Sequence, residues 1–447
     1  MTVPLPAHTD PVVGRLLSDP LLPELGHGLG GPYHLLLPDA FDANAAAFRK
    51  VLAEAGVDGR VYFAKKANKA SVFAERAATA GLGVDVASKG EMREALAAGV
   101  RGGELVVTGP AKADELLRVA VLHGALIVVD ALDELDRLDT AARELDRTAR
   151  VLLRVLPPDQ PHSRFGLDGN DITAALDRLG GSAVDLEGFS FHLFGYDTGQ
   201  RADLAAALVR LCHRARDLGL RADRISIGGG FAVDYVGGAD WQRFEESSRP
   251  EHFHAAKRFT GGFYPYHSPV AGADALRAVL AAVPVGEDAT LAELLRAADV
   301  GLLVEPGRAL LDQAGFTVFR VQGVKERDGY AILTVDGSSL SLSEQWFGSE
   351  FLPDPVLVPA RREAVARSGP YPACVGAATC LESDLLTWRK IPFRTPPAVG
   401  DLLVYLNTAG YQMDSNESPF HELPLPPKVV VEPTANRFRW RLDRHPA

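Results

Sequence analysis

Residues 60–87 of the chain are RVYFAKKANKASVFAERAATAGLGVDVA. Two short apolar runs, RVYFA and GVDVA, flank an alanine-rich amphipathic stretch at residues 71–80. Strands that are apolar on both faces and alternate with helices are typical of a parallel sheet covered by helices. This stretch therefore predicts one strand–helix–strand unit.

The same alternation continues over residues 32–310. The further apolar runs are YHLLL, ELVVTG, ALIVVD, VLLRVL, GFSFHL, RISIG and GLLVEPG. Most are followed by an amphipathic stretch, and Asp39 and Ser88 are expected to cap the helices that follow them. About eight such units over about 270 residues favour a (β/α)8 barrel over an open sheet. We place this barrel at residues 39–310.

The pattern changes after residue 311. The runs TVFRVQGVK, YAILTVDG, LLVYLN and VVVEP indicate strands separated by proline and glycine turns, with few helices. This part predicts a second, mainly β domain. Residues 237–284, rich in Phe, Tyr, His and Gly, interrupt the barrel pattern and are interpreted as an insertion that shapes the substrate site.

Composition and charge exclude several functional classes. The formal net charge of −11 disfavours a nucleic-acid partner. The three cysteines, Cys212, Cys374 and Cys380, form no CxxC pair, so neither a disulfide framework nor a metal site is expected. The N-terminus does not resemble a signal peptide, and no window of about 20 residues is apolar and uncharged. The sequence therefore predicts a cytoplasmic protein with no membrane span.

Two motifs at strand ends suggest a site for an anionic cofactor. Lys65 and Lys66 follow the run RVYFA, where a desolvated lysine could lose its proton and form a Schiff base. Taken alone, they also fit a surface loop. Gly228, Gly229 and Gly230 follow RISI and allow main-chain N–H groups to approach an anion, although a tight turn explains them equally well.

Three further residue types are candidates for chemistry. Glu305 ends the strand GLLV, and a buried carboxylate there needs a partner, either a protonated ring nitrogen or Arg308. His192 lies among aromatic residues at a strand end and could stack on a flat ring or be structural. Cys380 stands in the predicted β domain, where a free cysteine is usually buried and inert.

In this order and spacing, these motifs resemble the ornithine/diaminopimelate/arginine decarboxylase family, whose members are fold-type III enzymes that use pyridoxal 5′-phosphate (PLP). The resemblance covers about residues 32–425 and implies an alanine-racemase-like barrel with a β-sandwich domain. We assign residues 1–38 and 311–447 to that second domain.

The resemblance also implies a PLP site assembled from distant residues. Phe63–Asn68 matches the family's Y-A-x-K-A-N motif, which puts the Schiff base on Lys66 and not on Lys65. His192 matches the histidine that stacks on the PLP ring, and Glu305 matches the partner of its nitrogen. The whole set of implied cofactor residues is Lys66, Asp85, Arg154, His192, Gly228, Gly229, Gly230, Glu305, Arg308 and Tyr411.

The resemblance further implies a homodimer with shared active sites. Cys380 and Asp384 match the family's C-x-x-x-D motif, which enters the active site of the other subunit. Cys380 would then be a general acid that protonates the α-carbon of the substrate. An ion pair between Lys112 and Asp384 across the interface is implied as well.

Two departures from the family pattern bear on the substrate. The family's H-x-G-S becomes His192-Leu193-Phe194-Gly195, so a serine that helps to hold the phosphate is missing. Members acting on basic amino acids usually have Asp or Glu after the cysteine, whereas this chain has Leu381, then Glu382. We therefore predict decarboxylation of an amino acid, or of a substrate derived from one, that is not a typical basic diamino acid. The alternatives are a PLP-dependent racemase or epimerase and a non-catalytic PLP-binding protein.

Overall fold

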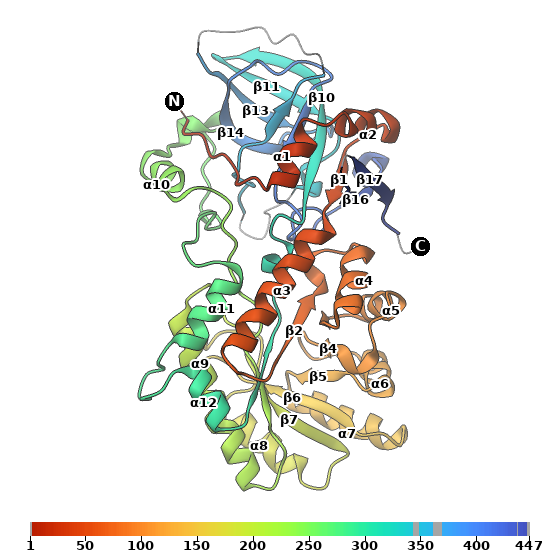
Figure 1. The fold of residues 1–447 in the computed structure, drawn as a ribbon, viewed down its shortest axis with the longest axis vertical. Coiled ribbons are helices and arrows are strands. Elements are labelled where there is room, and N and C mark those ends of the chain that lie inside the picture. The colour runs from red at the N-terminus through yellow and green to blue at the C-terminus, as the bar shows by residue number, and fades with distance from the viewer. Residues whose placement is uncertain (1, 343–347, 361–368, 436, 445–447) are drawn as a thin grey trace.

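Eight parallel strands close into a barrel, which forms the lower half of the molecule in Figure 1. The computed structural model describes residues 2–342, 348–360, 369–435 and 437–444. The barrel strands are β2 (Gly59–Ala64), β3 (Gly83–Val86), β4 (Leu105–Val107), β5 (Leu126–Val129), β6 (Ala149–Arg154), β7 (Val184–Ser190), β8 (Arg224–Ser226) and β9 (Gly301–Val304). The predicted barrel is thus confirmed, with each strand among the apolar runs of the sequence.

A ring of helices surrounds the barrel. These helices are α3 (Pro38–Glu54), α4 (Ser71–Ala80), α5 (Lys89–Ala97), α6 (Asp114–Leu122), α7 (Leu132–Glu144), α8 (Gly169–Leu179), α9 (Thr198–Asp217), α11 (Gly272–Ala281) and α12 (Leu291–Ala297). Ser88 caps α5 as predicted, by accepting a hydrogen bond from the main-chain N–H of Glu91. The prediction that Asp39 caps α3 is wrong, because Pro38 occupies the first helical turn and Leu37 is the capping residue. Of the helices described, none has the length and apolar character needed to cross a membrane.

The second part of the chain is a mainly β domain, which confirms the predicted fold class. Its sheet has the order β14-β13-β11-β10-β1-β16-β17, and β15 pairs with β10 and β12. These strands are β1 (Tyr33–Leu36), β10 (Gly315–Arg327), β11 (Tyr330–Val335), β12 (Val356–Val358), β13 (Tyr371–Gly376), β14 (Leu385–Phe393), β15 (Leu402–Tyr405), β16 (Lys428–Pro433) and β17 (Phe438–Leu442). The run YHLLL therefore does not belong to the barrel series, because β1 pairs with β10 and β16.

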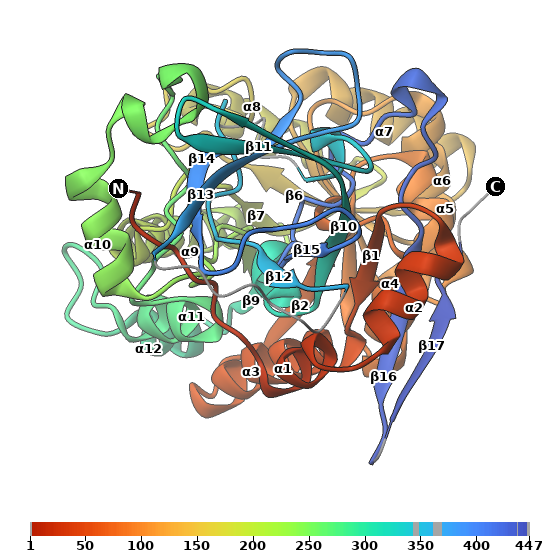
Figure 2. The same cartoon turned by 90° about the horizontal axis from the view of Figure 1, so that it is seen from above.

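The N-terminal helices pack on this sheet rather than on the barrel. Helices α1 (Pro11–Leu17) and α2 (Leu21–Leu29) bury Leu16 and Leu22 in a core that includes Leu35 and Val404. The chain thus starts in the β domain, runs through the barrel and returns (Figures 1 and 2).

The segment predicted as an insertion is largely irregular but ends in a barrel helix. After α10 (Gly238–Ser247) come short 3₁₀ turns and a loop that buries Tyr264 and Tyr266. Helix α11, which lies within the predicted insertion, packs between α3 and α9 and so completes the helix ring. Edge-to-face contacts of Tyr235 with Tyr264 and Tyr266 tie this loop to the segment after the triple glycine.

The β domain contacts the carboxyl ends of the barrel strands directly. The main-chain N–H of Tyr411 donates to the carbonyl of Ala67 over 2.8 Å, and the Asn68 side chain donates to the carbonyl of Ala409. The N–H of Lys69 donates to the Asp414 carboxylate. The loop that follows β2 is therefore held by the β domain.

Gly188 in β7 offers a test of the barrel geometry. A Cβ at this position would lie 1.8 Å from the carbonyl oxygen of Arg224 on β8, and its φ of 149° is unfavourable for other residues. We expect Gly188→Ala to reduce the free energy of unfolding by about 3 kcal/mol. Urea denaturation measures this, with Gly169→Ala as the control, since nothing lies within 4 Å of a Cβ there. Equal losses in both variants would contradict the strand packing described.

Candidate active site

An ion pair lies at the carboxyl ends of β2 and β3. The Lys66 Nζ donates to Asp85 Oδ2 over 2.7 Å, and Thr108 Oγ1 donates to the other carboxylate oxygen over 2.5 Å. Asp85 is buried, whereas the Lys66 side chain is 45% exposed because it faces a cavity. Both residues come from strand ends that meet at one edge of the barrel, where catalytic residues of this fold gather.

Electrostatics keep the Lys66 amine protonated. Burial alone would lower its pKa, but the negative charge of Asp85 and its hydrogen bond to Lys66 outweigh burial and raise the pKa above the usual value for lysine. The expectation that desolvation deprotonates Lys66 is therefore wrong for the protein without a ligand, because the sequence does not reveal how close Asp85 lies.

Glu305 is a second buried carboxylate in the same cavity. It follows β9, and its Oε1 accepts a hydrogen bond of 2.6 Å from Ser226 at the end of β8. Burial and the nearby Asp85 charge raise its pKa to about 7. Glu305 is thus a carboxylate that an adjacent cation would stabilise.

The triple glycine forms a tight loop beside these groups. Gly228 and Gly230 have positive φ angles of 65° and 77°. A Cβ on Gly229 would lie 2.8 Å from the carbonyl oxygen of Glu305. Underneath the loop, the buried Arg201 donates to the carbonyls of Gly230, Gly195 and Ile227. Only glycine fits here, and the loop leaves room for a ligand group that approaches the main chain.

Arg308 and Tyr411 close the side of the cavity nearest to the β domain. The Arg308 guanidinium donates to the Tyr235 hydroxyl over 3.1 Å and lies 5.0 Å from the Tyr411 ring centre and 4.3 Å from that of Tyr264. Tyr411 has a φ of 77°, an uncommon conformation for a bulky residue. Its hydrogen bond to Ala67 holds this conformation.

His192 and Arg154 line the opposite side. Burial, with the positive charges of Lys66 and Arg154, lowers the pKa of His192 to about 3, so the imidazole is neutral. Arg154 lies 3.4 Å from Asp130 and stacks on the Phe165 ring at 4.4 Å. A neutral imidazole can stack on a flat ring without adding positive charge.

These residues surround two adjoining cavities of about 690 Å³ and 280 Å³. Both are lined by Lys66, His192 and Glu305. The larger one is bordered by aromatic residues of the irregular loop, with Phe263 and Tyr264 among them. The structure thus brings together the predicted residues Lys66, Asp85, Arg154, His192, Gly228, Gly229, Gly230, Glu305, Arg308 and Tyr411. Sequence reasoning missed Ser226, Arg201, Tyr235 and Tyr264, although Ser226 and Tyr264 stand in stretches that it singled out.

The implied ion pair between Lys112 and Asp384 would span two subunits, and within one chain both side chains have other partners. Lys112 is buried, with its Nζ 3.0 Å from Glu134 and donating to the carbonyl of Val128 over 2.7 Å. Asp384 is buried in the β domain, where it accepts hydrogen bonds from Ser339 and Thr379. Each residue is satisfied within its own domain, because burial requires a nearby partner.

Cys380, Leu381 and Glu382 lie apart from the cavity around Lys66. They form an exposed turn between β13 and β14, and none of them lines either cavity in its own chain. The expectation that a free cysteine here is buried is wrong, because Cys380 is exposed. The Sγ of Cys380 lies 3.1 Å from His421 Nε2.

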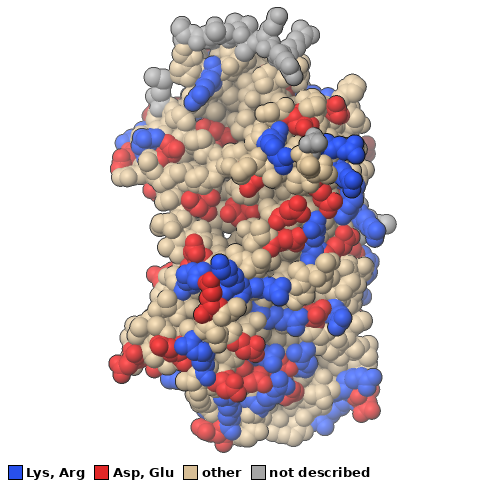
Figure 3. Space-filling view, viewed as in Figure 1, with Lys and Arg blue, Asp and Glu red and all other residues tan. Residues whose placement is uncertain are grey.

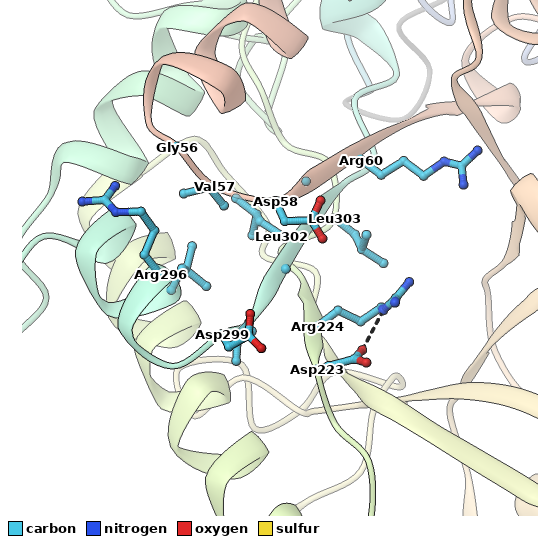
Figure 4. A pocket seen from close by; sticks show the side chains of 14 residues that line it. Gly56, Val57, Asp58, Arg60, Asp223, Arg224, Arg296, Asp299, Leu302 and Leu303 are labelled. Atoms are coloured by element: carbon cyan, nitrogen blue, oxygen red, sulfur yellow. Dashed lines mark hydrogen bonds and ion pairs between the residues drawn. The ribbon is translucent and has the colours of Figure 1, made fainter.

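A third cavity, of about 580 Å³, opens at the other end of the barrel (Figure 4). Among its charged groups, Arg60 pairs with Glu104, and Arg224 pairs with Asp223 and Glu187. This end of a barrel serves stability more often than chemistry. On the face in Figure 3, acidic and basic side chains are interspersed over the barrel half.

Comparison with known proteins identifies the family. The family model described as "Pyridoxal-dependent decarboxylase, pyridoxal binding domain" matches residues 39–262. The chain belongs to the pyridoxal-dependent decarboxylase family. It is 39% identical to "Uncharacterized protein y4yA" of Sinorhizobium fredii, over 92% of this chain and 90% of that protein. It is 28% identical to the diaminopimelate decarboxylase of Deinococcus radiodurans, over 93% of each chain.

Solved structures share the fold of this decarboxylase. The diaminopimelate decarboxylase of Helicobacter pylori, in complex with L-lysine, superimposes with a TM-score of 0.70 at 17% identity. It covers 92% of this chain and 94% of its own. The family resemblance and the PLP cofactor predicted from the sequence are thereby confirmed.

The residues present fit PLP. The lysine amine suits the aldehyde of PLP, and the glycine loop with the arginine beside it suits the phosphate. The buried carboxylate with a raised pKa suits the ring nitrogen. The neutral His192 matches its flat ring.

The pKa of Lys66 provides a test of the ion pair. We expect Asp85→Asn to lower this pKa, because the variant loses the main opposing charge and keeps the burial. Only the neutral amine is reductively methylated, so Lys66 in the cofactor-free variant should react at lower pH than in the wild type, as followed by mass spectrometry. Thr108→Val, which keeps the carboxylate, is the control. Identical pH profiles for Asp85→Asn and the wild type would argue against the pair.

Glu305 should make the stability of the cofactor-free protein depend on pH. Its pKa is about 7 in the folded state and about 4.3 when unfolded, so the wild type loses stability as the pH rises through this window. Glu305→Gln cannot lose a proton. It should therefore gain stability relative to the wild type at pH 8 but not at pH 5, measured by urea denaturation. The exposed Glu245→Gln serves as the control and should show no such pH-dependent gain.

Proposed function

We propose that this enzyme decarboxylates an amino acid whose side chain carries no distal ammonium group, with PLP held by Lys66. The observation on which this rests is the cluster of Lys66, Asp85 and Glu305 at the carboxyl ends of β2, β3 and β9. The leucine at position 381 supports the restriction on the substrate.

The geometry of the cavity supports the following roles toward PLP. Lys66 would be the covalent attachment point, and Gly228–Gly230, Arg308 and Tyr411 would hold the phosphate. Glu305, whose carboxylate is fixed by Ser226, would pair with the ring nitrogen and keep it protonated. When bound, PLP would supply an electron sink for the α-carbon.

We assign the proton transfer to the α-carbon to a donor from the partner subunit. His192 remains neutral because of its lowered pKa and serves as a stacking surface rather than as an acid. In the proposed homodimer, the exposed Cys380 of one subunit enters the cavity of the other and donates the proton to the α-carbon. Asp130 holds Arg154 at the edge of the cavity.

The lining of the larger cavity fits a substrate without a second cation. Its residues are mainly apolar or aromatic, and among them Phe194 is 82% exposed. Leu381 is 50% exposed on the turn that also carries Cys380. A distal ammonium group next to these side chains would lose hydration without gaining a partner.

A racemase or epimerase on the same scaffold is the alternative, since it would remove the α-proton instead of carbon dioxide. The presence of Cys380 and Asp384 favours decarboxylation. Exchange of the α-proton for deuterium without release of carbon dioxide would establish the alternative.

Release of carbon dioxide from a panel of amino acids tests the proposal. We expect activity on amino acids without a distal ammonium group, and a loss of at least about a hundredfold in Lys66→Ala. Lys65→Ala is the control, because the Lys65 amine donates to the carbonyl of Lys69 and does not line the cavity. Leu381→Asp should improve the preference for lysine or ornithine by about tenfold, whereas the exposed Leu425→Asp should not. Release from lysine or ornithine alone by the wild type would refute the substrate assignment.

A further inference from the structure

We propose that His421 is the proton partner of Cys380, so that the two form a thiol–imidazole pair at the exposed edge of the β domain. This inference rests on the proposed function for its catalytic meaning. The pair itself is a feature of this chain, and its test does not require a substrate.

The geometry brings two distant segments together. Cys380 lies on the turn between β13 and β14, and His421 lies in a short 3₁₀ turn, Phe420–Glu422, 41 residues later. The distance of 3.1 Å between Sγ and Nε2 is within hydrogen-bond range for sulfur. The Phe420 ring lies edge-on to the imidazole, with 4.4 Å between ring centres.

The backbone at His421 is unusual in a way that suggests positioning. His421 and Glu422 have φ angles of 60° and 57°, in the left-handed region. A non-glycine residue there costs free energy, and such residues cluster at functional sites. In this conformation the imidazole of His421 lies next to the sulfur of Cys380.

Three carboxylates stand near the pair in the sequence. Glu382 and Glu422 are exposed, and Asp384 is buried and held by Thr379 and Ser339. In general, a carboxylate close to an imidazole favours transfer of a proton to the imidazole. The resulting thiolate is the reactive form of cysteine.

The proton balance of the pair fits the proposed reaction. Sγ and Nε2 lie within hydrogen-bond distance, so a proton can pass between them. After Cys380 has given its proton to the α-carbon, the Nε2 of His421 takes one from water and passes it to the sulfur. His421 is therefore a positioning residue that keeps Cys380 supplied, whereas Cys380 is the group that touches the substrate.

The three cysteines make the pair measurable. Cys212 and Cys374 are buried, and burial raises the pKa of both thiols, whereas Cys380 is exposed. Iodoacetamide should therefore react first at Cys380. The thiolate displaces iodide and forms a carbon–sulfur bond, while the thiol proton passes to His421.

The decisive experiment compares the rate of Cys380 alkylation in the holoenzyme and in His421→Asn, by peptide mass spectrometry between pH 6 and 9. Asn tolerates the left-handed backbone, so this variant removes the base and keeps the turn. We expect alkylation at pH 7 to slow about tenfold, with the profile shifted to higher pH. Glu422→Asn makes the same substitution at the next left-handed position, keeps the imidazole, and should stay within about twofold of the wild type.

A proton partner and a residue that only packs against Cys380 predict opposite changes in the alkylation rate when His421 is replaced by Asn. Removing the imidazole opens access to the sulfur, so a residue that merely packs against Cys380 would give equal or faster alkylation in His421→Asn. That result would overturn the proposal. If alkylation is slower in His421→Asn but the wild-type holoenzyme releases no carbon dioxide from any amino acid, the pair is supported and the proposed function is rejected.

Discussion

The pair of buried carboxylates around Lys66 is the constraint on which the rest of the structure depends. Asp85 and Glu305 stand at the ends of separate strands, and each accepts a hydrogen bond from a hydroxyl, Thr108 or Ser226. Burial of two like charges is unfavourable unless cations accompany them. Lys66 satisfies Asp85, whereas Glu305 is left with a pKa raised to about 7. A protonated ring nitrogen would relieve this imbalance, so the polypeptide is arranged for a cation that it does not itself contain.

The β domain is part of this arrangement rather than an appendage. Tyr411 reaches the cavity from it in a left-handed conformation, held by the carbonyl of Ala67 next to Lys66. Strand β1 precedes the barrel in the sequence and pairs with β10 and β16, which follow it. The whole barrel is therefore inserted between strands of the β domain. Loss of the β domain would remove both Tyr411 from the lining of the cavity and the support of the loop after β2.

The sequence predicts the barrel and most of the cavity because both depend on local pattern. In a barrel the carboxyl ends of the strands meet, so Lys66 after β2 and Glu305 after β9 are brought together by topology alone. Partners that come from elsewhere could not be predicted. Lys112, in the loop before α6, pairs with Glu134 on α7, and Cys380 pairs with His421 across 41 residues. The pKa of Lys66 depends on its distance to Asp85, which the spacing in the sequence does not reveal. The predicted cap of α3 was wrong because Pro38 lies in the first helical turn, which makes Leu37 the capping residue.

The missing serine of the phosphate loop shows how the structure accommodates a departure from the family pattern. Gly195 stands in its place, and the carbonyl of Gly195 accepts a hydrogen bond from Arg201. Arg201 is buried, which lowers its pKa to about 10, so the guanidinium still carries its charge at neutral pH. It also donates to Gly230 and Ile227, and so fixes the glycine loop from below. Arg201 is therefore a charged support beneath the glycine loop. At Gly195 the φ of 96° disfavours a side chain even though nothing lies within 4 Å of a Cβ there, and the preceding Phe194 is an apolar residue that lines the larger cavity.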